Sequence, residues 1–159
     1  MLENLKVRDL IGKREKIYSV DADDTTDVAA LKLRNFKVRT IGAMKSGGLV
    51  GVIGQSDLAN KVVAMSRNPS EVKVSEIMST KIVNVQLDSS FFECLELMDT
   101  HHISHLVILD KNEKYYGMLS WKDLQQRLIE ELKYQLQLTQ EYAFGPHCNL
   151  LLDQLRKQQ

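Results

Sequence analysis

The sequence contains little cysteine. Cys94 and Cys148 are its only two cysteines, and they do not form a CxxC pair. Cys94 lies in an apolar helical pattern, FFECLELM, where small buried thiols are common. We therefore expect no structural disulfide.

The chain also lacks an excess charge and a long apolar run. Its 21 basic and 21 acidic side chains cancel, so it has no basic field to attract nucleic acid. The N-terminal MLENLKVRDL does not resemble a signal peptide, and no apolar run approaches the roughly 20 residues that span a bilayer. With 43% hydrophobic and 26% charged residues, the sequence predicts a folded, cytoplasmic protein without a nucleic-acid or membrane partner.

Motifs of catalysis and metal binding are missing as well. The sequence has no GxSxG, HExxH or GxxxxGK[ST] motif, and we expect no enzyme activity. His101, His102 and His105 are close in sequence. A predicted change from helix to strand near Ile103 spoils their spacing as ligands, so we expect no metal site.

What the sequence does contain is an internal repeat with a period of about 65 residues. Matching segments open each copy and continue into a hydroxyl-rich turn: VRDLI, IYSV and DDTT in the first, and VSEIM, IVNV and DSS in the second. A helix with one apolar face, two strands and a final helix follow in both. Each copy is therefore predicted to be a β-α-β-β-α unit, which gives a mixed α/β (α+β) fold.

Pro69 marks the predicted linker, because proline lacks a backbone donor and disfavours helix in the preceding residue. We assign a first unit to residues 1–66, a linker to 67–72, a second unit to 73–130 and a C-terminal extension to 131–159. Neither unit is large enough to cover its sheet alone, so we expect the two to pack about a pseudo-twofold axis.

Leucines recur every four residues in the C-terminal extension. Leu124, Leu128, Leu132 and Leu136 predict that the last helix continues to about Ala143, where the pair at 145–146, Gly-Pro, ends it. The leucine stripe could pack on the protein itself, join two chains or transmit a signal, and Leu150 to Leu152 leave the same alternatives open.

Over about residues 6–130 the following order of motifs occurs twice: V-x-x-[LI]-[IM], a strand, a helix that begins with Ser or Thr, two strands and G-h-h-[ST]-x-x-D. This order of motifs resembles a tandem pair of CBS domains, known as a Bateman module. The second copy is the closer match. In the first copy Gly54 stands where the family usually has Ser or Thr, although Asp57 is retained. The resemblance implies a regulatory module with no required cofactor. Its expected ligand is AMP, ADP, ATP or S-adenosylmethionine, bound between the units.

The resemblance also implies two related pockets. In one, Asp123 binds ribose hydroxyls, Ser120 donates to ribose or phosphate, and Met118 contacts adenine. Residues of the first copy would complete it: Tyr18, Val38 and Arg39. Ser104 and His105 could approach the same phosphate as Arg39. In the other pocket Asp57 binds ribose, and the base is surrounded by Val52, Val83 and Ile103.

Simpler interpretations stand beside these assignments. Ser120-x-x-Asp123 is also a helix capping box, which is compatible with binding. We place Arg39 on a strand, where its charge needs a phosphate, but it could instead pair with one of the acids between Asp21 and Asp27. The alternative function is a ligand-free module that forms a homodimer or docks a regulated protein through the leucine stripe.

Overall fold

Two three-stranded sheets form the centre of the fold in the computed structural model, which describes residues 2–12 and 17–156, with residues 143–156 as backbone only. The first sheet has the order β1 (Ser19–Asp21), β2 (Thr40–Lys45), β3 (Gly48–Gly54), and the second has the order β4 (Asn84–Gln86), β5 (His105–Leu109), β6 (Tyr115–Ser120). In each sheet the first two strands are parallel and the last two antiparallel. The predicted repeat of β-α-β-β-α units is confirmed.

A helix crosses between the parallel strands of each unit, α2 (Thr26–Phe36) in the first and α5 (Phe91–Thr100) in the second. Ser90 caps α5: its Oγ accepts from the Glu93 N–H at 3.1 Å, and Glu93 accepts in return from the Ser90 N–H at 3.3 Å. The apolar faces that the repeat predicts are buried, with Ala29 and Leu33 on α2 matching Cys94 and Met98 on α5.

Each unit has its own core. The first core contains Val20, Ala29, Leu33, Ile41, Ala43, Ile53, Val62, Val72, Val74 and Ile77. The second core contains Val7, Val85, Phe91, Cys94, Met98, Leu106, Ile108, Leu119 and Leu124. Two short segments therefore contribute to the core of the other unit. Val7, on α1 (Val7–Ile11), belongs to the second core, and Val74, on α4 (Val74–Ile77), belongs to the first.

The exchange of these segments is reciprocal. The Val7 N–H donates to the Ser89 carbonyl at 2.9 Å, and the Val74 N–H donates to the Asp24 carbonyl at 2.9 Å. Val7 and Val74 occupy equivalent places in the repeat, as do Asp24 and Ser89, so the same bond is made twice with the units interchanged. This equivalence is what a pseudo-twofold relation requires. The unit boundaries assigned from the sequence stay a prediction. The cores do not follow these boundaries, because Val7 and Val74 each pack in the core of the other unit.

Tyr115 connects the two sheets directly. Its hydroxyl donates to the Tyr18 carbonyl and accepts from the Gly42 N–H, both at 3.2 Å. Tyr115 belongs to β6, whereas Gly42 lies in the middle of β2. A buried side chain of one unit is thus hydrogen-bonded to the backbone of the other.

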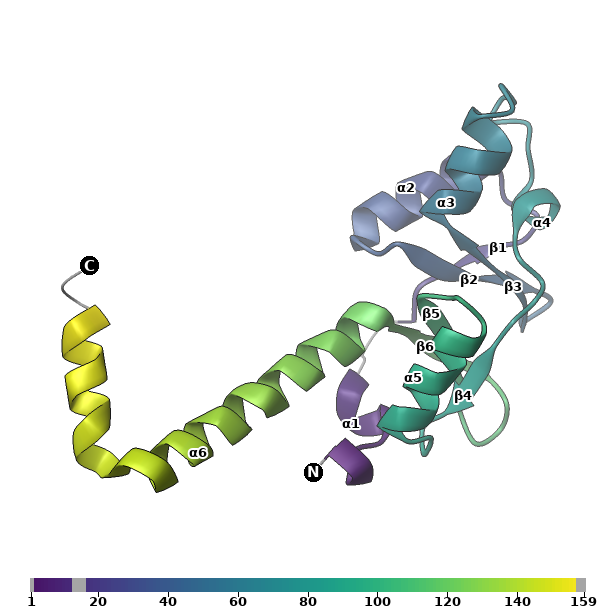
Figure 1. The fold of residues 1–159 in the computed structure, drawn as a ribbon. Coiled ribbons are helices and arrows are strands. Elements are labelled where there is room, and N and C mark those ends of the chain that lie inside the picture. The colour runs from purple at the N-terminus through teal and green to yellow at the C-terminus, as the bar shows by residue number, and fades with distance from the viewer. Residues whose placement is uncertain (1, 13–16, 157–159) are drawn as a thin grey trace.

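The helices after β3 and β6 differ greatly in length. The first unit ends with α3 (Gln55–Leu58) and the π-helical turn η2 (Ala59–Val63), whereas α6 runs over Trp121–Arg156 and projects away from both units (Figure 1). The predicted end of this helix at Gly-Pro, residues 145–146, is wrong. A proline inside a helix removes one hydrogen bond and kinks the helix without necessarily ending it, and α6 bends sharply in its yellow-green portion (Figure 1).

The leucine stripe of α6 is buried only at its start. Leu124 is fully buried, and Leu128 packs against the second core. Leu132 and Leu136 are each 59% exposed. Leu150 to Leu152 lie outside the residues whose side chains are described. Within the described chain, no helix has the length and apolar character needed to cross a membrane.

Candidate ligand cavity between the units

A cavity of about 1010 Å³ lies between the two units. The first unit contributes Tyr18 and the segment 37–40 that leads into β2, and the second contributes Ser104, His105, residues of β6 and the first turn of α6. The cavity brings together eight residues that the sequence predicts as binding residues: Tyr18, Val38, Arg39, Ser104, His105, Met118, Ser120 and Asp123. These residues come from both copies of the repeat.

Ser120 and Asp123 are held together where β6 passes into α6. The Ser120 N–H and Oγ donate to Asp123 Oδ2 at 2.8 and 2.7 Å, and the Asp123 N–H contacts Ser120 Oγ at 3.3 Å. The capping box predicted from sequence is therefore present. It fixes a carboxylate and a hydroxyl at the cavity wall.

Arg39 lies just before β2 and not on the strand, which corrects the sequence-based placement. Helix α2 ends at Phe36, and the next residue, Lys37, is in the left-handed conformation with φ of 54°. Val38 and Arg39 then connect Lys37 to the start of β2 at Thr40. The Arg39 side chain is exposed, so burial does not force its charge to find a partner. Within the described residues it forms no ion pair, and Asp23 and Asp24 pair instead with Lys45 and Lys32.

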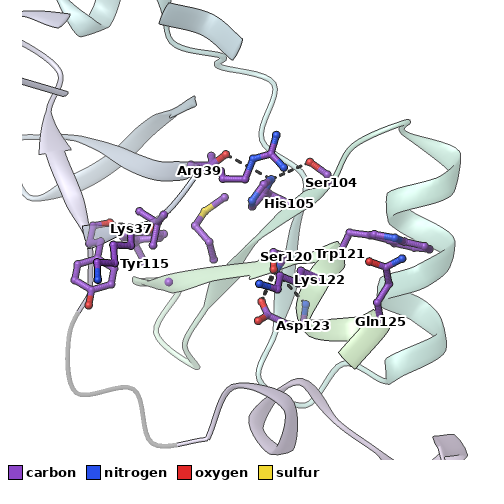
Figure 2. A pocket seen from close by; sticks show the side chains of 15 residues that line it. Lys37, Arg39, Ser104, His105, Tyr115, Ser120, Trp121, Lys122, Asp123 and Gln125 are labelled. Carbon is purple, nitrogen blue, oxygen red and sulfur yellow. Dashed lines mark hydrogen bonds between the residues drawn. The ribbon is translucent and has the colours of Figure 1, made fainter. Parts of the chain in front are cut away.

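His105 lies beside Arg39 and Ser104 (Figure 2). Its Nδ1 is 3.0 Å from Ser104 Oγ and 3.4 Å from Thr40 Oγ1. Burial lowers the pKa of His105 below its ordinary value, the Arg39 guanidinium lowers it further, and the Asp123 carboxylate opposes both. The imidazole is therefore mainly neutral at neutral pH and can gain a proton if an anion enters.

The charged lining of the cavity is mostly basic. Among the described residues, Lys37, Arg39 and Lys122 line it, and Asp123 is the one acidic side chain. Such a surface favours an anionic ligand. Sequence reasoning missed Lys37 and Lys122, although Lys122 lies within the quoted G-h-h-[ST]-x-x-D motif. The other lining residues were not among those predicted to bind: Thr40, Tyr115, Gly117, Trp121 and Gln125.

Comparison with known proteins places this architecture in a family. The CBS domain profile matches residues 74–130. The uncharacterized protein YlbB of Bacillus subtilis is 30% identical over 121 residues, which cover 75% of this chain and 79% of that protein. The chain belongs to the CBS-domain family. An uncharacterized protein of Methanopyrus kandleri is 33% identical to this CBS protein over 73% of the chain, but the chain spans only 59% of that relative.

Solved structures agree with the tandem CBS arrangement. A putative signal-transduction protein with CBS domains from Burkholderia ambifaria is 29% identical, with a TM-score of 0.71, and the match covers 76% of this chain and 90% of that one. A CBS domain protein from Pyrobaculum aerophilum, complexed with AMP, has the same fold at 22% identity and a TM-score of 0.67. That match covers 75% of this chain and 89% of the other.

The second predicted pocket of this CBS pair lies outside the cavity. Asp57 accepts from the Gly54 N–H at 2.9 Å and from Lys61 Nζ at 2.7 Å, and Lys61 Nζ also donates to the Ile77 carbonyl at 2.6 Å. Val52 is paired through its backbone with Ser79, at 2.9 and 2.8 Å. Both carboxylate oxygens of Asp57 are thus engaged within the protein.

The apolar residues assigned to that second pocket are also placed elsewhere. Val83 and Ile103 pack against the second core. None of Asp57, Val52, Val83 and Ile103 is among the described residues that line the cavity of about 1010 Å³. Their role in binding stays a prediction.

Proposed function

We propose that this chain is a regulatory module that binds an adenine nucleotide in the cavity between its CBS units. The observation that carries the proposal is the placement of the Ser120–Asp123 pair opposite Arg39 and His105 in one cavity. A carboxylate can accept hydrogen bonds from both ribose hydroxyls, and a guanidinium suits a phosphate. The AMP-bound relative from Pyrobaculum aerophilum supports this ligand class.

Each cavity residue then has a role. Asp123 binds the ribose, and Arg39 binds the phosphate with help from Ser104 and His105. The Ser120 hydroxyl turns from Asp123 and donates to ribose or phosphate when the ligand is bound. The apolar surfaces of Met118, Tyr18 and Val38 surround the base. Because the described charged residues of the lining are mostly basic, a phosphorylated nucleotide is favoured over S-adenosylmethionine, whose sulfonium adds a positive charge.

Calorimetric titration with AMP, ADP, ATP and S-adenosylmethionine tests the proposal. We expect the nucleotides to bind, and we expect Arg39→Ala to weaken binding by about 10- to 100-fold, the usual loss for a hydrogen bond to a charged group. Lys111→Ala is the matched control, because Lys111 is an exposed cation in the β5–β6 turn, outside the cavity. Absence of binding by all three nucleotides, or equal losses in both variants, would contradict the proposal.

Dimerisation through α6 is a second candidate function, and the exposed part of the leucine stripe on this helix favours it. Ile129, Leu132 and Leu136 are 51%, 59% and 59% exposed and follow a three-then-four spacing. Ile and Leu in the first two of these positions suit a parallel two-stranded coiled coil. In that pairing Gln135 faces Gln140 of the second copy, so no like charges oppose each other there. The occupant that we propose is therefore a second copy of this chain.

Light scattering during size-exclusion chromatography distinguishes this assembly from a monomer. We expect a dimer that Leu132→Glu converts to a monomer, while Gln137→Glu, at an exposed position on the opposite face of the helix, leaves it intact. A monomeric wild-type chain, or a dimer that survives Leu132→Glu, rules out the α6 interface.

A further inference from the structure

A second apolar ridge runs along the projecting part of α6. Tyr134, Leu138 and Tyr142 follow one another at intervals of four residues, which places them on one face of the helix. Leu138 is two residues after Leu136, or about 200° further around the helix, because one turn takes about 3.6 residues. This tyrosine ridge therefore lies on the opposite face from the seam through which α6 would pair with a second copy.

The tyrosine ridge is bare in the folded chain. Tyr134 and Tyr142 are 49% and 88% exposed, and this part of α6 projects away from both units (Figure 1). In the proposed parallel coiled coil, with Ile129 and Leu132 in the first two seam positions, Tyr134 and Leu138 take outer positions. A second copy that pairs through the seam therefore leaves the ridge exposed.

Two carboxylates flank the tyrosine ridge. Glu131 lies one turn before the first tyrosine and Glu141 lies three residues after Leu138, so each is a neighbour of the ridge on the helix surface. At about 1.5 Å per residue they are about 15 Å apart along the axis. Each carboxylate is oriented by a glutamine: Gln135 Nε2 donates to Glu131 at 3.0 Å, and Gln137 Nε2 donates to Glu141 at 2.9 Å.

The charge on this face restricts the class of partner. Among the described residues neither Glu131 nor Glu141 forms an ion pair, and Arg127, which shares this face of α6, is paired with Glu130 at 3.2 Å. The phosphates of a nucleic acid or of an acidic lipid surface would be repelled by the two carboxylates. A protein segment that combines apolar and cationic side chains would instead complement both the ridge and its flanks.

We propose that the tyrosine ridge binds a cationic amphipathic helix of a partner protein, whose apolar face covers the ridge and whose lysines or arginines reach Glu131 and Glu141. Tyrosine is among the residues that most often carry the binding energy of protein interfaces. Helix α6 begins at the wall of the cavity, because Trp121, Lys122 and Asp123 line it. One helix thus connects the proposed nucleotide site to the partner, although docking on the ridge does not require a nucleotide.

Three labelled synthetic helices test the proposal. The first carries leucines along one face with lysines beside them, the second has glutamate in place of every lysine, and the third has the composition of the first with its leucines scattered around the helix. Fluorescence anisotropy measures the affinity of each peptide for the full chain. We expect the first to bind at least about tenfold more tightly than the others. Its affinity should fall as salt rises from about 0.05 M to about 0.5 M, because exposed charges are screened.

Variants of α6 locate the binding face. The double variant Tyr134→Ala/Tyr142→Ala should bind the first peptide at least about tenfold more weakly, whereas phenylalanine at both positions should keep most of the affinity. Glu131→Gln with Glu141→Gln should weaken binding about 2- to 30-fold, the combined effect of two exposed ion pairs. Gln140→Ala, about 200° around the helix from the ridge, is the matched control and should change the affinity less than about twofold.

Several results would overturn the inference. Equal binding of the first two peptides, or of the amphipathic and scattered peptides, would do so, as would an unchanged affinity in the double tyrosine variant. If no peptide binds, the inference also fails, and smaller assemblies of that variant in light scattering would identify a second copy as the occupant of the ridge. If AMP does not bind but the first peptide does, the proposed nucleotide function fails and the docking face stands. Leu132→Glu should leave peptide binding intact, which separates the ridge from the dimer seam.

Discussion

The Tyr115 hydroxyl should contribute measurably to stability, because it connects the two sheets by hydrogen bonds. Tyr115→Phe keeps the ring but removes both hydroxyl hydrogen bonds, to the Tyr18 carbonyl and from the Gly42 N–H. Gly42 is buried, so its N–H loses its partner without gaining water, which costs about 1–3 kcal/mol. The partly exposed Tyr18 can recover a hydrogen bond from water and adds little.

We therefore expect Tyr115→Phe to lower the free energy of unfolding by about 2 kcal/mol and the melting temperature by roughly 4–8 °C for a chain of this size. Urea denaturation followed by circular dichroism measures this change. The transition should stay single, because α1 and α4 each belong to the core of the other unit and prevent the units from unfolding separately.

Tyr116→Phe is the matched control, because it also removes a tyrosine hydroxyl, from the next residue in the chain. Tyr116 packs against the second core, and its hydroxyl has no hydrogen bond to any described residue. We expect a change below about 0.5 kcal/mol. If both variants lose equal stability, or Tyr115→Phe loses none, then the contact between Tyr115 and Gly42 does not hold the units together.

Three further predictions concern buried and close-packed positions. Burial, with a smaller effect from Glu93, raises the pKa of Cys94 to about 12, so in a Cys148→Ser background Ellman's reagent at pH 8 should react only after unfolding; rapid reaction of folded protein would contradict this. The pKa of His105 is lowered in the folded state, so the unfolded chain binds a proton more readily and the free energy of unfolding should fall as the pH drops below about 6.5. His105→Gln should flatten this part of the profile of melting temperature against pH. An unchanged slope would show that other groups cause the pH dependence. A Cβ at Gly51 would lie 2.6 Å from Met78 Sδ and 2.9 Å from the Ser79 carbonyl oxygen. Gly51→Ala should therefore lower the free energy of unfolding, measured by urea denaturation, by about 1–3 kcal/mol. Gly48→Ala, whose Cβ would come no closer than 3.8 Å to a neighbouring atom, should lower it much less, and equal losses would exclude close packing as the cause.

Much of the fold could be predicted because it depends on local patterns. The apolar faces of α2 and α5, the Ser90 cap and the paired strands all follow from side-chain spacing and turn residues. The eight cavity residues came from the family resemblance, whose motifs lie at the ends of strands and helices.

Other features depend on contacts between distant segments. Val7 and Val74 stand in equivalent sequence positions, and nothing in their local pattern indicates that each packs in the core of the other unit. The contact that Tyr115 makes between the units was not predicted, because its hydrogen-bond partners, Tyr18 and Gly42, are 97 and 73 residues away. Arg39 was placed on a strand because apolar residues surround it, whereas the left-handed Lys37 shifts the start of β2 to Thr40.

The central claim is that one cavity, next to Asp123, binds an adenine nucleotide. Calorimetric titration of AMP into wild type, Asp123→Asn and Asp57→Asn tests it most directly, because asparagine can still accept the capping hydrogen bonds in both variants. We expect one AMP per wild-type chain, the same stoichiometry and affinity in Asp57→Asn, and at least tenfold weaker binding in Asp123→Asn. Two AMP molecules per chain, or a greater loss in Asp57→Asn than in Asp123→Asn, would contradict the account.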